Sequence, residues 1–171
     1  MKGYVQIYTG DGKCKTTAAL GLAVRAVGAG LRVYLGQFIK AGCYSEIAIL
    51  RDRFPEVTVE QYGQGKFVIG PPDAEDLRLA REGFERLRQV VQQGRHDVVI
   101  ADEATSAVAA GLLSDDDLLT LMREKPGHVE LVITGRGASP RLQAAADLVT
   151  EMRCVKHYYD AGVQGRPGIE S

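Results

Sequence analysis

The sequence predicts an α/β protein built on an open, mostly parallel sheet of about six strands, with helices on both faces. Two observations support this prediction. Short runs rich in Val, Ile and Tyr alternate along the chain with longer segments of helical character. A glycine-rich turn at residues 9–14 joins the first such run to the first helical segment. Because strands and helices alternate, the strands are expected to run parallel to one another.

Each element has its own sequence signal. The run at 98–101 is apolar throughout, which is typical of a strand buried on both faces. Asp73 and Ser114 are good N-cap residues, each followed by acidic residues where the helix dipole favours negative charge. The expected strands span residues 4–8, 31–38, 57–62, 98–101, 129–134 and 147–152. The expected helices span residues 15–29, 44–53, 73–93, 104–110, 114–123 and 140–146.

Composition limits the class of protein. The 171 residues fit a single domain covering residues 1–171, and 45% hydrophobic residues supply a core. The 21 basic and 22 acidic residues nearly cancel, which argues against disorder and against binding to nucleic acid or an anionic membrane. No uncharged apolar run reaches the roughly 18 residues of a membrane span, and no signal-peptide pattern is found. Three cysteines without a C-x-x-C pattern favour free thiols, as in the cytoplasm.

The turn after the first predicted strand has the composition of a phosphate-binding loop. Backbone N–H groups of such a loop face phosphate oxygens, and the following helix N-terminus adds partial positive charge. Lys15 would contact a terminal phosphate and the Thr16 hydroxyl would bind Mg²⁺. The strict pattern G-x-x-x-x-G-K-[ST] is not met, because Thr9 and Cys14 stand where it has glycines. The candidate residues are Thr9, Gly10, Asp11, Gly12, Lys13, Cys14, Lys15, Thr16 and Thr17.

Two further candidates follow later strands, at the edge of the sheet where such proteins bind ligands. Asp102 and Glu103 come directly after the apolar run at 98–101, in the manner of a Walker B strand. Paired carboxylates there suit a hard cation such as Mg²⁺. Arg136 follows the fifth predicted strand and is a candidate clamp for phosphates. Together these features predict a P-loop NTPase fold of the RecA-like type.

Beyond the loop TGDGKCKTTAA, several segments resemble the ATP:corrinoid adenosyltransferases, the family that includes cob(I)yrinic acid a,c-diamide adenosyltransferase. The resemblance covers nearly the whole chain, and its most specific parts lie near the C-terminus. The matching segments are RAVGAG at 25–30, QFIK at 37–40, the Asp-Glu pair, TGRG at 134–137, ADLVTEM at 146–152, VKHYYDAGV at 155–163 and GIE at 168–170.

The resemblance implies a reaction in which the 5′-deoxyadenosyl group of ATP passes to Co(I) of a reduced corrinoid and triphosphate leaves. Lys15, Thr16 and Glu103 would then be catalytic, with Mg²⁺ held by Thr16, Asp102 and Glu103. Arg25 would contact ATP. Arg136 and His157 would line the nucleotide or corrinoid pocket. The implied partners are ATP, the corrinoid, a reductase that supplies Co(I), and a second copy in a homodimer.

The chain also departs from the family pattern. Cys14 replaces a glycine between Lys13 and Lys15, so we expect its thiol to be the most readily alkylated and to be protected by Mg-ATP. Ala41 replaces the glycine after QFIK. The aromatic pair that covers the corrinoid in some members is absent, and Phe67 is the candidate to replace it.

Two other interpretations fit the residues. A RecA-like ATPase or nucleoside kinase would share the loop and the Asp-Glu pair but would release ADP. A catalytically weak paralogue would bind ATP or corrinoid without turnover. The preferred corrinoid is left open by the sequence.

Overall fold

The computed structural model describes residues 2–42, 44–65 and 70–170. These residues form one sheet of six parallel strands in the order β3-β2-β4-β5-β1-β6. The predicted fold class is therefore confirmed. The strands are β1 Val5–Thr9, β2 Val33–Phe38, β3 Val57–Tyr62, β4 Val98–Asp102, β5 Glu130–Thr134 and β6 Leu148–Glu151.

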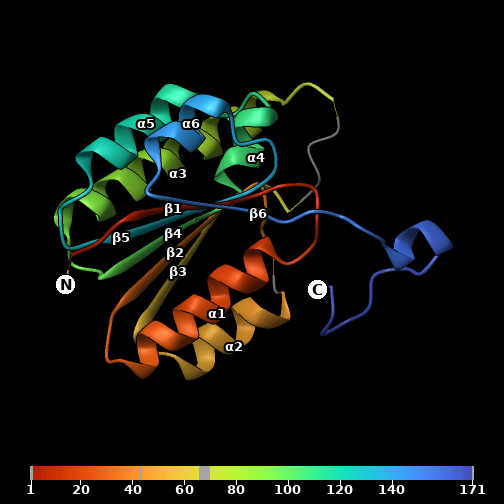
Figure 1. Cartoon of the computed structure of the whole chain (residues 1–171), viewed down its shortest axis with the longest axis horizontal. Helices are drawn as coiled ribbons and strands as arrows, with labels where there is room; N and C mark the ends of the chain where they lie inside the picture. The colour runs from red at the N-terminus through yellow and green to blue at the C-terminus, as the bar shows by residue number, and fades with distance from the viewer. Residues whose placement is uncertain (1, 43, 66–69, 171) are drawn as a thin grey trace.

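Helices cover both faces of the sheet (Figure 1). On one face lie α1 (Lys15–Gly28) and α2 (Ser45–Arg53). The other face carries α3 Ala74–Gln93, α4 Ala104–Ala109, α5 Asp115–Glu124 and α6 Pro140–Ala145. The segment after β6 contains one short 3₁₀ helix, η1 (Tyr158–Ala161). No described helix combines the length and the apolar character needed to cross a bilayer.

The predicted caps form as expected. The Asp73 carboxylate accepts the Asp76 N–H at 2.8 Å, and the Asp76 carboxylate accepts the Asp73 N–H in return. Ser114 and Asp117 make the same reciprocal pair at the start of α5. Gly94 ends α3 with φ of 59°. These local signals fixed the helix ends to within about two residues, the usual uncertainty of such boundaries.

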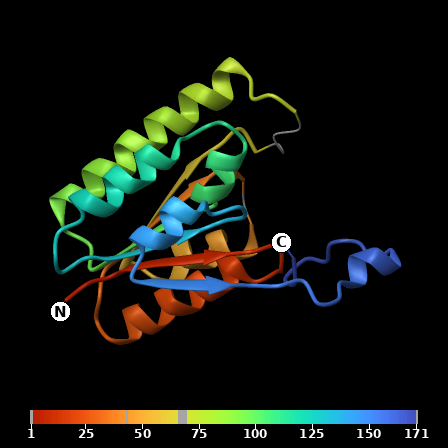
Figure 2. The ribbon, with the colours of Figure 1, turned by 45° about the horizontal axis from the view of Figure 1, so that its top comes forward.

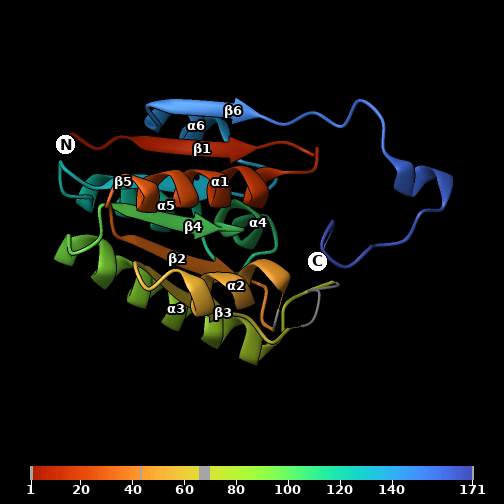
Figure 3. The ribbon, with the colours of Figure 1, turned by 90° about the horizontal axis from the view of Figure 1, so that it is seen from below.

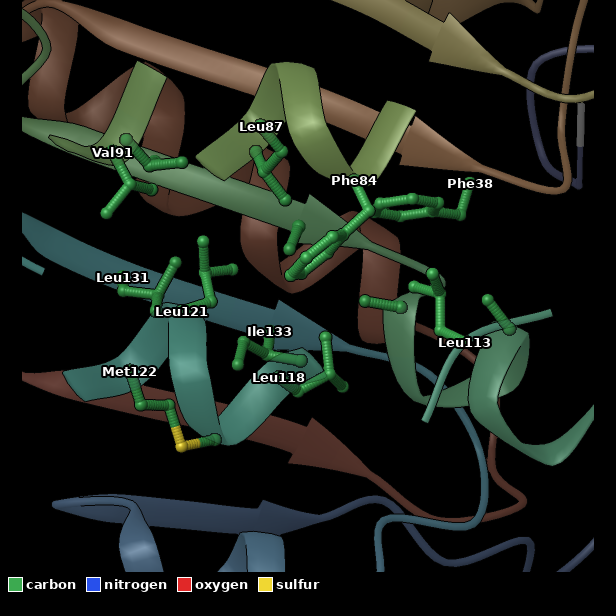
Figure 4. Close-up of a cluster of buried hydrophobic side chains, with 14 of the residues drawn as sticks. Phe38, Phe84, Leu87, Val91, Leu113, Leu118, Leu121, Met122, Leu131 and Ile133 are labelled. Atoms are coloured by element: carbon green, nitrogen blue, oxygen red, sulfur yellow. The ribbon is translucent and has the colours of Figure 1, made fainter. Parts of the chain in front are cut away.

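Two apolar layers hold the helices against the sheet. Phe84 and Leu87 of α3 and Leu121 of α5 pack on Leu131 and neighbouring strand residues (Figure 4). On the opposite face α1 presents a buried row of Ala19, Ala23 and Ala26. Such small side chains let a helix lie close to a sheet. As a result, the first turn of α1 lies next to the carboxyl ends of the central strands.

The strand order places chemistry-bearing residues together. Strand β4 lies between β2 and β5, and Gln37 of β2 pairs in register with Asp102 of β4. Thr134 ends β5 on the other side of β4. All three of these side chains are buried. The carboxyl ends of parallel strands share one edge of the sheet, where ligands of α/β proteins bind.

Strand β6 is the edge of the sheet next to β1, and all four of its residues are exposed. After it, the chain leaves the body of the molecule and forms a tail of residues 153–170 (Figure 3). The tail carries the exposed apolar residues Val155, Tyr159 and Ile169. This edge is therefore the least covered part of the described fold.

Substitution of two helical glycines tests how closely α3 packs on β3. A Cβ at Gly83 in α3 would lie 2.3 Å from Cγ of Tyr62, whereas a Cβ at Gly21 in α1 would meet nothing within 4 Å. We expect Gly83→Ala to lower the free energy of unfolding by about 1–3 kcal/mol through overpacking. Gly21→Ala should raise it by roughly 0.5–1 kcal/mol through helix propensity. Urea denaturation measures both, and equal stability of the two variants would contradict the close contact of α3 with β3.

Candidate active site

The glycine-rich loop runs from β1 into α1 and rests on the segment after β6. The Gly12 N–H donates to the Met152 carbonyl at 2.7 Å. A Cβ at Gly10 would lie 2.4 Å from that same oxygen, and one at Gly12 would lie 2.7 Å from it. Only glycine fits at either position. Gly10 also has φ of 97°, a conformation that glycine adopts without strain.

Cys14 stands just before α1 with φ of 87°. For a residue with a side chain this left-handed conformation costs about 1–2 kcal/mol. The sequence departure at this position therefore coincides with backbone strain. The thiol is exposed and lines the same cavity as Lys15 and Thr16.

Lys15 turns back into the loop. Its ammonium donates to the carbonyl oxygens of Gly10 and Gly12, each at 2.7 Å. Burial lowers the pKa of Lys15, and the nearby charge of Arg136 lowers it further. Two loop carbonyls thus hold the Lys15 ammonium at the centre of the glycine-rich loop. A bound phosphate oxygen would replace these carbonyls as the acceptor of its hydrogen bonds.

Asp102 organises the polar groups behind the loop. Its carboxylate is completely buried. One oxygen, Oδ1, accepts the hydroxyls of Thr16 at 2.9 Å and Thr134 at 2.6 Å. The other, Oδ2, accepts the amide of Gln37 at 2.9 Å. Burial without these partners would be very costly for a carboxylate, so the contacts fix α1, β2 and β5 relative to β4.

Glu103 differs from its neighbour because it faces the cavity. It adopts a left-handed conformation with φ of 57°, and its N–H donates to Thr134 Oγ1 at 3.0 Å. Its side chain remains 22% exposed. Of the two carboxylates, Glu103 is the one accessible to a ligand in the cavity, while Asp102 orients the Thr16 hydroxyl.

Lys40 lies among these oxygens, although the sequence analysis gave it no role. Its ammonium is 3.6 Å from Asp102 Oδ2 and 3.5 Å from Glu103 Oε1, and it donates to Thr16 Oγ1 at 3.4 Å. Burial lowers the pKa of Lys40, but Asp102, Glu103 and Glu46 outweigh burial and raise it above its usual value. The QFIK segment, which spans the last two residues of β2 and the two residues after it, was the signal that could have identified this residue.

The oxygen set around Lys40 fits a magnesium ion. Two carboxylates and a hydroxyl surround one positive charge, and Mg²⁺ prefers oxygen ligands. Among the described residues no group of three or more His, Cys, Asp or Glu side chains forms a metal cluster. A few protein oxygens completed by phosphates and water are the usual arrangement for Mg²⁺.

The cavity beside the loop has a volume of about 1050 Å³ and two kinds of wall. Its polar wall includes Lys15, Glu103 and Arg136, and its apolar wall includes Leu20 and Val24 of α1. The Arg136 backbone N–H donates to Ser106 Oγ at 2.9 Å, which fixes the turn after β5. A cavity of this size is at the upper end of the range for small-molecule sites.

The tail turns back toward the start of α1 (Figure 2). The Lys13 ammonium donates to Tyr158 Oη at 3.2 Å, to the Ile169 carbonyl at 3.0 Å and to Glu170 Oε1 at 3.0 Å. Arg166 also pairs with Glu170, at 3.2 Å. The hydrogen bond and charge of Glu170 raise the pKa of Lys13. The closing GIE segment, matched in sequence but given no role, therefore lies at the loop.

The structure brings most predicted residues together. Thr17 lines the cavity, and Thr9 lies beneath the loop, where its hydroxyl accepts the Ala138 N–H at 3.2 Å. Asp11 is exposed. Arg25 is in the last turn of α1 and is not among the residues that line the cavity.

His157, another predicted residue, makes no hydrogen bond or ion pair with the loop among the described residues. His157 caps η1, where its Nδ1 accepts the Tyr159 N–H at 3.0 Å, so that its neighbour Tyr158 makes the contact with Lys13 instead. Phe67 lies outside the described residues.

A phosphate-type loop, a buried aspartate behind it and a parallel sheet define a nucleotide-binding protein of the P-loop class. The whole chain, residues 1–171, matches the family model described as ATP:corrinoid adenosyltransferase BtuR/CobO/CobP. It is 36% identical over 172 residues to the corrinoid adenosyltransferase of Pseudomonas aeruginosa, covering 99% of this chain and 84% of that protein. It is also 36% identical over 171 residues to the corrinoid adenosyltransferase of Escherichia coli K12, and 35% identical over 171 residues to corrinoid adenosyltransferase CobA of Salmonella typhimurium. Each of these two alignments covers 99% of this chain and 86% of the relative. The chain belongs to the ATP:corrinoid adenosyltransferase family.

The exposed thiol in the loop provides a test of nucleotide placement. We expect iodoacetamide to label Cys14 and Mg-ATP to slow that labelling severalfold, because a bound triphosphate covers the loop. Cys154 is also exposed but lies in the tail outside the cavity, so its labelling serves as the internal control. Peptide mass spectrometry separates the two sites. Equal protection of both thiols, or of neither, would contradict ATP binding at this loop.

Proposed function

We propose that this adenosyltransferase carries out its reaction in the cavity beside α1. Co(I) of a reduced corrinoid attacks C5′ of ATP, the C5′–O bond breaks, and inorganic triphosphate leaves with the bonding electron pair. The new Co–C bond uses the electron pair of Co(I). The observation that supports this best is the set of oxygens around Lys40, directly behind the phosphate-type loop, of which those of Thr16 and Glu103 line the cavity.

The protein has no need to create a nucleophile, because the corrinoid supplies one. Its task is to hold C5′ in line with cobalt and to neutralise the charge that develops on triphosphate. Lys13, Lys15 and Arg136 are the cations at the cavity that bind triphosphate in this proposal. Mg²⁺, bound at Thr16 and Glu103, supplies additional charge for the leaving group.

Asp102 acts indirectly in this proposal. Because it is completely buried and accepts the Thr16 hydroxyl, it orients the oxygen that faces the metal. The apolar wall formed by Leu20, Val24 and Tyr44 borders the space opposite the loop, and the corrinoid is placed there. Arg25, Phe67 and His157 remain proposals for the wider nucleotide and corrinoid site.

The proposal includes partners beyond the two substrates. A reductase is proposed from the family resemblance, because the cobalt must be reduced to Co(I) before it can act as the nucleophile. The reaction is placed in the cytoplasm, where ATP is abundant. A homodimer is proposed from the family resemblance and from the uncovered β6 edge, since exposed sheet edges commonly pair with another chain.

An anaerobic assay tests the reaction. The protein is mixed with Mg-ATP and chemically reduced cob(I)alamin, and the expected products are a light-sensitive Co–C species and one equivalent of triphosphate. Glu103→Gln should lower the rate strongly, because it removes a charged oxygen proposed to bind the metal. Release of ADP without a Co–C species would instead support an ATPase or kinase. ATP binding without either product would support a binding paralogue.

The uncovered edge gives a second test. Leu148 of β6 is 45% exposed, and Leu148→Lys places a charge on that edge. We expect the unmodified protein to sediment as a dimer and this variant to shift toward monomer at the same concentration. Val24→Lys, a matched change at a residue 50% exposed on α1, should leave the sedimentation unchanged. A monomeric unmodified protein would contradict the dimer.

A further inference from the structure

Among the described residues, Lys40 is the one cation whose ammonium lies within 3.6 Å of Thr16 and Glu103, the two groups proposed to bind metal, and of the Asp102 carboxylate behind them. Its side chain is 27% exposed at the cavity, and its ammonium lies among Asp102, Glu103 and the Thr16 hydroxyl. A positive charge therefore already lies where the metal is expected. This placement needs an explanation, since a lysine and a divalent ion cannot share the position.

The backbone turn at Ile39 directs the Lys40 side chain toward these oxygens. Ile39 has φ of 64°, which is a strained conformation for a β-branched residue. The Lys40 N–H closes this turn on the Phe38 carbonyl at 2.6 Å. A Cβ at Gly63 would lie 2.1 Å from the Ile39 carbonyl, so the neighbouring chain packs directly on the turn. Strain that the surrounding structure enforces in this way is typical of functional sites.

The charges of Asp102, Glu103 and a bound metal ion determine when Lys40 must move. With Lys40 in place, the two carboxylates keep one uncompensated negative charge. A divalent cation bound at Thr16 and Glu103 would balance the charge of both carboxylates and would repel the ammonium a few ångströms away. Lys40 and Ile39 line the same cavity as Lys15 and Arg136, so a short side-chain movement brings the ammonium to the phosphates of a bound nucleotide.

We propose that Lys40 is a further substrate-binding residue. In the nucleotide-free protein it occupies the divalent-cation position, and when Mg-ATP binds it transfers to the triphosphate. This inference rests on the proposed function, because it assumes that Mg-ATP binds at the loop. It predicts opposite effects of Lys40 on two binding equilibria, which a purely structural lysine would not produce.

The test compares Lys40→Met with the unmodified protein in two measurements. Binding of Mn²⁺ without nucleotide is followed by electron paramagnetic resonance, and the variant should bind Mn²⁺ about tenfold more tightly, because no ammonium competes for the carboxylates. Mg-ATP binding is followed by calorimetry, and the variant should bind about tenfold more weakly, because one phosphate contact is lost. Lys40→Gln repeats both measurements should the methionine variant fold poorly.

Two control variants distinguish an effect at the proposed metal site from a general effect of removing a positive charge. Lys2→Met removes an exposed lysine outside the cavity and should change neither equilibrium. Thr16→Val removes the hydroxyl but keeps the shape of the side chain, and should weaken Mn²⁺ binding. Metal-induced stabilisation against heat should be larger in Lys40→Met than in the unmodified protein.

Several results would overturn the inference. These are weaker or unchanged Mn²⁺ binding in Lys40→Met, unchanged Mg-ATP binding in that variant, or no Mn²⁺ binding in either protein. Failure of the proposed function looks different. The unmodified protein would then bind no Mg-ATP at all, while the Mn²⁺ comparison would still show whether Lys40 occupies a cation site.

Discussion

The buried carboxylate of Asp102 is the contact on which the active-site edge depends. It accepts side-chain hydrogen bonds from α1, β2 and β5, through Thr16, Gln37 and Thr134. A buried charge is tolerated only when such partners surround it. Each partner is therefore fixed in position as well as needed for stability. A single side chain therefore holds the first turn of α1 and the ends of three strands in one arrangement. It also orients the Thr16 hydroxyl, which we propose binds the metal.

The loop depends in turn on the opposite edge of the sheet. Gly10 and Gly12 have no room for a side chain because the Met152 carbonyl lies against them. The segment that follows β6 thus packs against the glycine-rich loop through Met152. The tail beyond it contacts Lys13 through Tyr158 and Glu170. A strand with all of its residues exposed would add little to a core. Its position is explained by the support it gives to the loop.

Sequence reasoning succeeded where the signal is local. The caps at Asp73 and Ser114, the apolar run of β4 and the turn into α1 each depend on residues close together in the chain. Strand order could not be predicted, because it depends on which strand ends pack together. Lys40 was missed for the same reason: its contacts form only because the end of β2 lies beside Asp102, the last residue of β4, and Glu103 after it. The contact of Glu170 with Lys13 joins residues 157 positions apart and has no local signature.

Three lysines of the described chain that line the cavity already have oxygen partners within the protein. Lys15 is held by loop carbonyls, Lys13 by the tail, and Lys40 by the two carboxylates. Binding of a triphosphate must therefore exchange one set of oxygens for another, and the net gain is smaller than the charge of the ligand suggests. Such an exchange also makes the site selective. A monophosphate offers too few oxygens to replace all three sets. In the proposed site, a triphosphate with its metal would satisfy the lysines and the carboxylates together, which would favour Mg-ATP over smaller anions.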